Sequence, residues 1–274
     1  MMKKTVIGAV ALLGALSMNT AVAKETISAV GSSSVTPLME VFSETYMKQN
    51  SNVFIEVQGP GSSAGVRAAK DGSADMGMSS RALKAEEKEA TLVEEVVARD
   101  GIAVVVNPEN SLKGLTSEQV TAIYKGEITN WKEVGGVDKP IVAITRDTAS
   151  GTRGAFEDIM SLKQKVSGIS VTAITQRAQV ANGNGALKVS VASNPYAIGY
   201  ISLGTVDESV HALTIDGVEP SVDNVKNDSY KVARPFLVLY KEGQPSAEAQ
   251  KFLDWMLADE AQAIVEKKGY ISVN

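Results

Sequence analysis

Short apolar runs alternate along the chain with segments in which apolar residues recur at helical spacing. Leu38, Val41, Phe42 and Tyr46 lie three or four positions apart, which predicts a helix from about Thr36. Strands are predicted at 27–30, 53–57, 74–78, 141–145, 171–175, 197–201 and 234–240, with two more in the valine-rich stretch 93–106. Further helices are predicted at 66–70, from 115, at 151–162, at 186–192 and at 246–268. This alternation predicts an α/β protein with largely parallel sheets.

Clusters of glycine, serine and threonine stand at several junctions between a predicted strand and a predicted helix. They occupy residues 31–36, 59–65 and 150–154, and a weaker cluster lies at 182–185. The first N–H groups of a helix lack partners within it, and the helix dipole is positive there. Glycine lets an anion approach the backbone, and hydroxyl groups add donors, so these junctions are candidate anion sites. The same residues also act as ordinary caps and turn formers, which leaves a structural role open for any single cluster.

Two other interpretations of these clusters fit the sequence less well. Residues 59–64 have the form G-x-G-x-x-A of a dinucleotide site, but Pro60 stands in the turn and the next strand ends in serine rather than an acidic residue. Ser150 is a candidate nucleophile of a phosphatase or esterase, but it does not lie in a G-x-S-x-G motif. The only available base is His211, which is predicted to be a solvated side chain in a polar stretch. Binding is therefore favoured over catalysis.

Composition narrows the chemistry further. The 274 residues include no cysteine and one histidine, which excludes disulfides, thiolate nucleophiles and metal sites rich in cysteine or histidine. Metal sites built only from carboxylates remain open, although the sequence has no DxDxDG-like spacing for calcium. We expect no metal and no cofactor. The formal charge of -5 argues against a nucleic-acid partner. It does not argue against a small anion, which local backbone dipoles can hold.

Residues 1–23 have the pattern of a secretory signal peptide. Lys3 and Lys4 form the charged region, residues 6–16 the apolar region, and Ala21-Val22-Ala23 the small-x-small cleavage pattern. Cleavage before Lys24 leaves 25 basic and 32 acidic residues, a formal charge of -7. The apolar run is shorter than the roughly 20 residues of a membrane span, and no cysteine is present for a lipid anchor. We expect a periplasmic protein, exported through the Sec pathway, without direct membrane insertion.

Three segments occur together in a specific order: GSSSVTP at 31–37, GPGSSAG at 59–65 and RDTASGTR at 146–153. With the signal peptide, they resemble the periplasmic phosphate-binding proteins of ABC phosphate importers, the PstS family. The resemblance covers essentially the whole mature chain. It implies an α/β, two-lobe periplasmic-binding-protein fold, each lobe a mixed sheet flanked by helices, with the ligand in the cleft between the lobes. Lobe 1 would comprise residues 24–106 and 236–274, and lobe 2 residues 107–235.

The resemblance also implies which residues hold phosphate. Arg146 would be the charged clamp, because its planar fork can donate two parallel hydrogen bonds to one oxyanion. The remaining candidates supply hydroxyl groups or backbone N–H groups. The full set is Ser33, Ser34, Val35, Ser62, Ser80, Arg81, Arg146, Ser150, Gly151 and Thr152. Asp147 either orients Arg146 or is only a turn residue.

One loop departs from the family pattern. Well-known members carry an aspartate just past a serine in this loop, where it accepts the proton of hydrogen phosphate and repels sulfate. Here Ser80 takes that place and Arg81 follows. A serine carries no charge against sulfate, and Arg81 would attract any dianion. Phosphate is the expected ligand, and sulfate or molybdate is the alternative. We expect a monomer without enzymatic activity whose partners are inorganic phosphate and the permease subunits of an ABC transporter.

Overall fold

The first part of the chain forms a regular series of strands and helices. The computed structural model describes residues 24–274, so the predicted signal peptide lies outside the described residues. The series is β1 (Glu25–Gly31), α1 (Thr36–Gln49), β2 (Val53–Gln58), α2 (Ser62–Asp71) and β3 (Met76–Ser79). β1 lies between β2 and β3 and is parallel to both. The sequence pattern predicted each of these elements, although α2 begins four residues earlier than expected.

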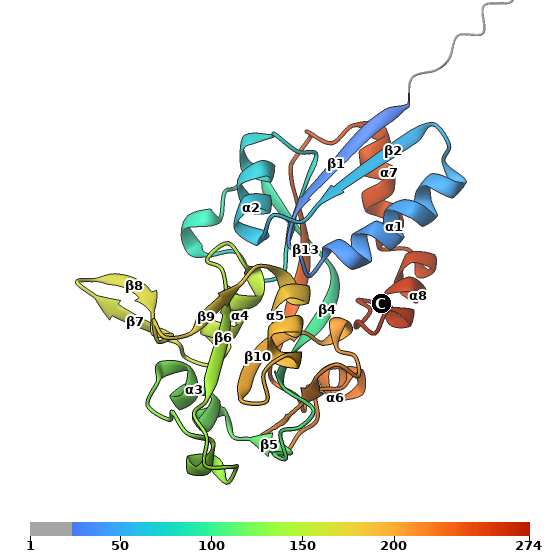
Figure 1. Cartoon of the computed structure of the whole chain (residues 1–274). Helices are drawn as coiled ribbons and strands as arrows, with labels where there is room; N and C mark the ends of the chain where they lie inside the picture. Colours follow the sequence, from blue (N-terminus) through green and yellow to red (C-terminus); the bar gives the residue numbers. More distant parts are fainter. Residues whose placement is uncertain (1–23) are drawn as a thin grey trace, which may run out of the picture.

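Two long antiparallel strands connect the two halves of the molecule (Figure 1). A 3-10 turn, Ala85–Glu87, precedes β4 (Leu92–Val106), which pairs with β13 (Ala233–Lys241) along most of its length. The prediction of two strands within 93–106 was wrong, because β4 continues without a break through Arg99, Asp100 and Gly101. Asp100 lies directly opposite Arg234 and forms an ion pair with it, so a charged residue fits inside the sheet.

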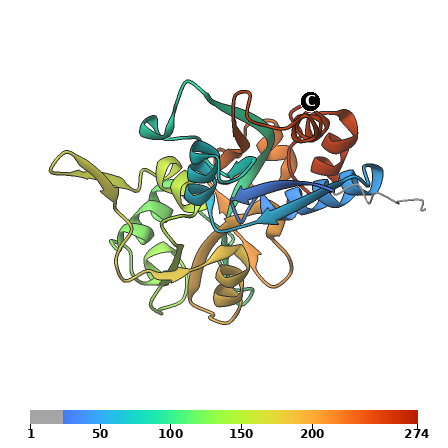
Figure 2. The ribbon, with the colours of Figure 1, turned by 90° about the horizontal axis from the view of Figure 1, so that it is seen from above.

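Between β4 and β13 the chain builds the second half of the sheet and its helices. The strands are β5 (Gly114–Leu115), β6 (Val142–Arg146), β7 (Lys163–Val166), β8 (Ile169–Thr172), β9 (Gln179–Ala181), β10 (Ala197–Ser202), β11 (His211–Ala212) and β12 (Thr214–Ile215). The helices are α3 (Ser117–Lys125), α4 (Gly151–Ile159), α5 (Gly183–Ala192) and α6 (Val222–Lys226), with 3-10 turns at Trp131–Val134 and Leu203–Thr205. Figures 1 and 2 both show the β7–β8 hairpin projecting from this half.

The main sheet is mixed. Its strand order is β2-β1-β3-β13-β4-β10-β6-β9, and β10 runs antiparallel to β4 but parallel to β6. The expectation of largely parallel sheets is therefore corrected, because β4 and β13 run in opposite directions through the middle of the sheet. The mixed sheets that the family resemblance implied are confirmed. The single helix predicted at 246–268 is two, α7 (Ala247–Met256) and α8 (Asp259–Lys267), separated at Leu257 and Ala258.

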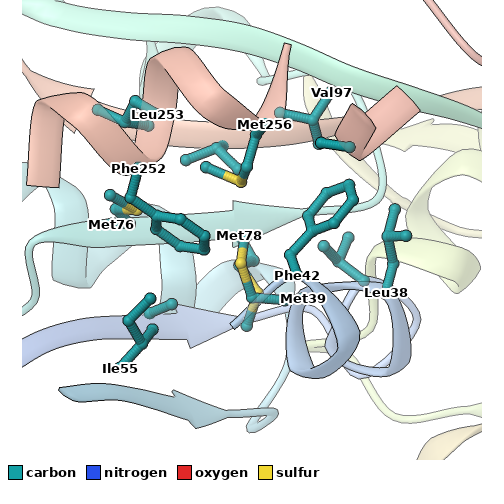
Figure 3. Packing of buried hydrophobic residues seen from close by; sticks show 14 of the residues in the cluster. Leu38, Met39, Phe42, Ile55, Met76, Met78, Val97, Phe252, Leu253 and Met256 are labelled. Carbon is teal, nitrogen blue, oxygen red and sulfur yellow. The ribbon is translucent and has the colours of Figure 1, made fainter. Parts of the chain in front are cut away.

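The hydrophobic core divides along the same two strands. One cluster packs α1 and α7 against the first strands, with Phe42, Met78, Phe252 and Met256 at its centre (Figure 3). A second cluster surrounds Trp131 in the other half. Along β4 the first cluster ends at Ala98 and the second begins at Ile102. On β4 the core thus changes between Ala98 and Ile102, a few residues before the boundary expected at residue 106. Lobe 1 as residues 24–106 with 236–274 and lobe 2 as residues 107–235 stay a proposal.

Two further observations concern the chain outside these cores. No helix within residues 24–274 has both the length and the apolar character needed to cross a membrane. His211 is half-buried on β11, where it lies opposite Val106 of β4. The prediction of a solvated histidine in a surface stretch was therefore wrong, because a short strand pairs with β4 at this point and half-buries the side chain.

Helix α2 packs closely against the sheet of lobe 1 at Gly65. A Cβ atom there would lie 2.5 Å from the Met78 carbonyl oxygen and 2.7 Å from that of Val30. Because backbone atoms cannot move aside cheaply, we expect Gly65→Ala to lower the free energy of unfolding by about 1–3 kcal/mol, measured by urea unfolding. Gly185→Ala, in α5 with open space around it, is the control and should stabilise by up to about 1 kcal/mol. Equal effects would contradict the packing argument.

Candidate anion-binding site

Loops from both lobes meet at one place, at the carboxyl ends of the strands. α1 and α2 of lobe 1 and α4 and α5 of lobe 2 begin at these loops, directly after β1, β2, β6 and β9. None of these four helices has an acidic residue in its first turn. The helices α3, α6, α7 and α8, which begin elsewhere, each have at least one. The positive ends of the four converging helices are therefore left uncompensated by side chains, as an anion site requires.

Hydrogen bonds join the two lobes directly across this meeting point. The hydroxyls of Ser34 and Thr152 lie 2.9 Å apart, and the Asn184 amide Nδ2 donates to the Ser34 hydroxyl at 3.0 Å. The Ser63 N–H donates to the Ala149 carbonyl at 3.1 Å. Hydroxyl and amide groups thus link the two lobes at this point.

Three serines of lobe 1 form a connected group on one side of the site. Ser32 Oγ donates to Ser80 Oγ at 2.8 Å, and the Ser80 N–H donates to Ser62 Oγ at 3.0 Å. Gly151 of lobe 2 closes against this group, because a Cβ atom there would lie 2.1 Å from Ser62 Oγ and 2.6 Å from Ser80 Oγ. Only glycine lets the start of α4 come this close to the serines.

Arg146 places a buried positive charge beside these donors. The residue is 1% exposed, and its guanidinium donates to Asn184 Oδ1 at 2.7 Å and to Ser33 Oγ at 3.0 Å. Burial lowers its pKa to about 10, so the guanidinium is charged at neutral pH. Among residues 24–274 no ion pair includes Arg146, and its Nε finds no hydrogen-bond partner. A buried cation held only by neutral acceptors favours an anionic ligand strongly.

Comparison with known proteins agrees with this geometry. Residues 18–260 match the family model of a PBP superfamily domain. A Bacillus subtilis protein named phosphate-binding protein PstS is 34% identical over 250 residues, which cover 89% of this chain and 79% of that protein. This chain belongs to the PstS family of phosphate-binding proteins.

Two solved structures of similar proteins confirm the two-lobe fold. One is a phosphate ABC transporter substrate-binding protein of Clostridium perfringens with bound phosphate, 44% identical, with a TM-score of 0.86 and coverage of 91% of this chain and 100% of that one. The other is an ABC-type phosphate transport receptor of Vibrio cholerae, 39% identical, with a TM-score of 0.77 and coverage of 89% and 99%. These PstS-type relatives are binding proteins, which agrees with the expectation that the chain is not an enzyme.

The structure brings most of the residues expected from the PstS resemblance to this one place. The group comprises Ser33, Ser34, Ser62, Ser80, Arg146, Gly151 and Thr152. Val35 precedes α1, and its N–H already donates to the Ser32 carbonyl. Ser150 caps α4 by accepting from the Arg153 N–H, and Asp147 accepts from the Ala149 N–H, as a turn residue does. That any of these residues touches phosphate stays a prediction.

Arg81 is buried at the edge of the group and is engaged with other partners. Its two Nη atoms donate to the Glu87 carboxylate at 2.6 and 2.7 Å, and Nη2 lies 3.4 Å from Ser63 Oγ. Its stem packs against Gly154 of lobe 2, where a Cβ atom would lie 2.7 Å from Arg81 Cδ. Its charge is thus balanced by Glu87, while its side chain contacts the opposite lobe.

Sequence reasoning missed three polar residues of the site. Asn184 lies between Ser34 and Arg146, and only the weak cluster at 182–185 pointed to it. Arg234 donates to Ser80 and is paired with Asp100, and both are almost fully buried. The available signal was a single arginine in the apolar run 232–240 and a single aspartate between the valine-rich halves of 93–106. A charge in a buried strand requires a partner, but the sequence alone does not say which.

Arg81→Ala tests whether this residue belongs to the site. We expect phosphate affinity to fall more than tenfold, because the substitution removes a guanidinium at the contact between the lobes and leaves the Glu87 carboxylate without its partner. Isothermal titration calorimetry measures the change. Arg67→Ala, an exposed arginine on the neighbouring helix α2, is the matched control and should bind like the wild type. Affinity close to wild type for Arg81→Ala would remove Arg81 from the site.

Proposed function

We propose that this protein binds inorganic phosphate outside the cytoplasmic membrane and delivers it to the permease subunits of an ABC importer. The observation that carries the proposal is the buried Arg146 guanidinium, which has no carboxylate partner within residues 24–274 and is surrounded by hydroxyl and amide groups from both lobes. A tetrahedral oxyanion has enough acceptor lone pairs for donors from both lobes at once. The names of the PstS-type relatives support phosphate as this oxyanion.

Binding would exchange contacts between the lobes for contacts to the anion. The Ser34–Thr152 hydroxyl pair crosses the site, and the Ser62 and Ser80 hydroxyls lie 3.4 Å apart within lobe 1. A phosphate among them would accept from these hydroxyls, from the Gly151 N–H and from Arg146. Loss of one such donor is expected to cost on the order of 1–3 kcal/mol. Because β4 and β13 are the strands that carry the sheet from one lobe to the other within residues 24–274, we infer that they form the hinge on which the lobes open and close.

The environment of Ser150 supports binding rather than hydrolysis. A nucleophilic serine needs a base within hydrogen-bond reach. In the described chain the Ser150 hydroxyl accepts from the Arg153 N–H, and the one histidine lies on β11 opposite Val106. We also propose a periplasmic location, reached through the Sec pathway without a lipid anchor, and a monomeric state.

Arg146→Gln tests the central charge. The amide cannot neutralise the anion, and removing one partner of a buried charge pair costs about 2–5 kcal/mol, so phosphate affinity should fall at least about thirtyfold in calorimetry. Arg177→Gln, an exposed arginine of the same lobe, is the control and should leave affinity unchanged. Unaltered affinity of the Arg146 variant would show that phosphate binds elsewhere or that the charge is not used.

A competition panel tests the identity of the ligand. Phosphate, arsenate, sulfate and molybdate are titrated against the mature protein after denaturation, extraction of bound anions and refolding. We expect phosphate and arsenate to compete for one site and sulfate to compete poorly. The hydroxyls, amides and guanidiniums of the site can donate hydrogen bonds to any tetrahedral oxyanion. If sulfate binds as tightly as arsenate, the protein would therefore be assigned as a general oxyanion-binding protein.

A further inference from the structure

Arg234 and Asp100 form a buried ion pair on the two strands that connect the lobes. They are register partners of β13 and β4, and their side chains are 1% and 0% exposed. Arg234 donates to Asp100 Oδ2 from Nη2 at 2.8 Å and from Nε at 3.2 Å. A buried ion pair contributes little net stability, because desolvation offsets the attraction. The position of this ion pair between the lobes therefore suggests a role other than stabilising the sheet.

The third donor group of Arg234 points away from Asp100 and reaches the anion site. Its Nη1 lies 3.3 Å from both the carbonyl oxygen and the hydroxyl oxygen of Ser80. The Ser80 hydroxyl also accepts from Ser32 Oγ at 2.8 Å. A serine hydroxyl has two acceptor positions and one proton. Ser32 Oγ and Arg234 Nη1 therefore occupy both acceptor positions of the Ser80 hydroxyl. The hydroxyl can make one further hydrogen bond, as a donor through its proton.

The direction of that proton follows from what surrounds Ser80. The Ser62 hydroxyl lies 3.4 Å away, which is longer than the roughly 2.5–3.0 Å of a well-formed O–H···O hydrogen bond, so it is a weak acceptor for the Ser80 proton. On the remaining side stands Gly151, the lobe 2 residue whose approach defines the site. A guanidinium that polarises the oxygen from behind makes the hydroxyl a better donor on its open side.

We propose that Asp100 and Arg234 are positioning residues that make Ser80 a dedicated hydrogen-bond donor to the bound anion. Asp100 fixes the guanidinium, the guanidinium occupies a lone pair of Ser80, and the Ser80 proton is left for the ligand. This inference rests on the proposed phosphate-binding function. It assigns a role in binding to two residues that do not touch the anion themselves.

A double-mutant cycle measured by calorimetry with inorganic phosphate tests the proposal. In the wild-type background we expect Ser80→Ala to weaken binding about tenfold or more. In the Asp100→Asn/Arg234→Gln background, which removes both buried charges together, the same substitution should weaken binding less than about threefold, because Ser80 is no longer held. Ser34→Ala is the matched reference, since Ser34 contacts Thr152 and Asn184 instead, and its cost should be equal in both backgrounds.

Each outcome separates the proposals. If Ser80→Ala costs the same in both backgrounds, Arg234 does not act through Ser80 and the inference is overturned. If the Asp100→Asn/Arg234→Gln background lowers the cost of Ser34→Ala as much as that of Ser80→Ala, the ion pair acts on the whole site. The proposed specific action on Ser80 is then overturned. If the double variant does not fold, as judged by circular dichroism and urea unfolding, the same cycle is measured in the Arg234→Lys background. A lysine ammonium cannot donate to Asp100 and Ser80 in the fixed geometry of the planar guanidinium. A wild-type protein that does not bind phosphate would instead defeat the proposed function.

Discussion

A buried guanidinium without a carboxylate partner is the interaction on which the rest of the site depends. Arg146 is held by neutral oxygens of Asn184 and Ser33, which belong to different lobes. The first turns of α1, α2, α4 and α5 add positive ends of helix dipoles at the same place without a compensating acidic side chain. The structure thus concentrates positive potential where the lobes meet, and an anion between them relieves it.

The strongly acidic composition does not oppose this local potential. Residues 24–274 have a formal charge of -7, yet the groups that meet at the site are hydroxyls, amides, backbone N–H groups and guanidiniums. At contact distance a fixed dipole or a buried charge outweighs distant surface charges, which water and salt screen. Arg81 and Arg234, in contrast, bring their own counter-charges, Glu87 and Asp100. Of these three arginines, Arg146 alone has no carboxylate partner among residues 24–274.

The sequence predicted the loops of the site better than the contacts between them. Glycine and hydroxyl residues before a helix have a local cause, so the clusters at 31–36, 59–65 and 150–154 could be identified from composition and spacing. The partners of the arginines could not. Arg81 turns to Glu87 only because a 3-10 turn brings that carboxylate back, and Arg234 meets Asp100 through a strand register that joins residues 134 positions apart. The continuity of β4 depends on the same pairing, which explains why two strands were expected there.

The division of the hydrophobic core has a consequence for how the chain folds after export. The core of lobe 1 includes Ile27, Phe42, Phe236 and Phe252, and so it needs both ends of the sequence. The proposed lobe 2, residues 107–235, holds most of the cluster around Trp131, to which the end of β4 from Ile102 and Ile271 near the C-terminus also contribute. Because contacts close in sequence form faster than distant ones, we expect most of the lobe 2 core to become compact before β13, α7 and α8 complete the core of lobe 1. The ion pair of Asp100 and Arg234 joins β4 to β13, so we expect it to form when β13 pairs with β4 and brings the C-terminal segment to lobe 1.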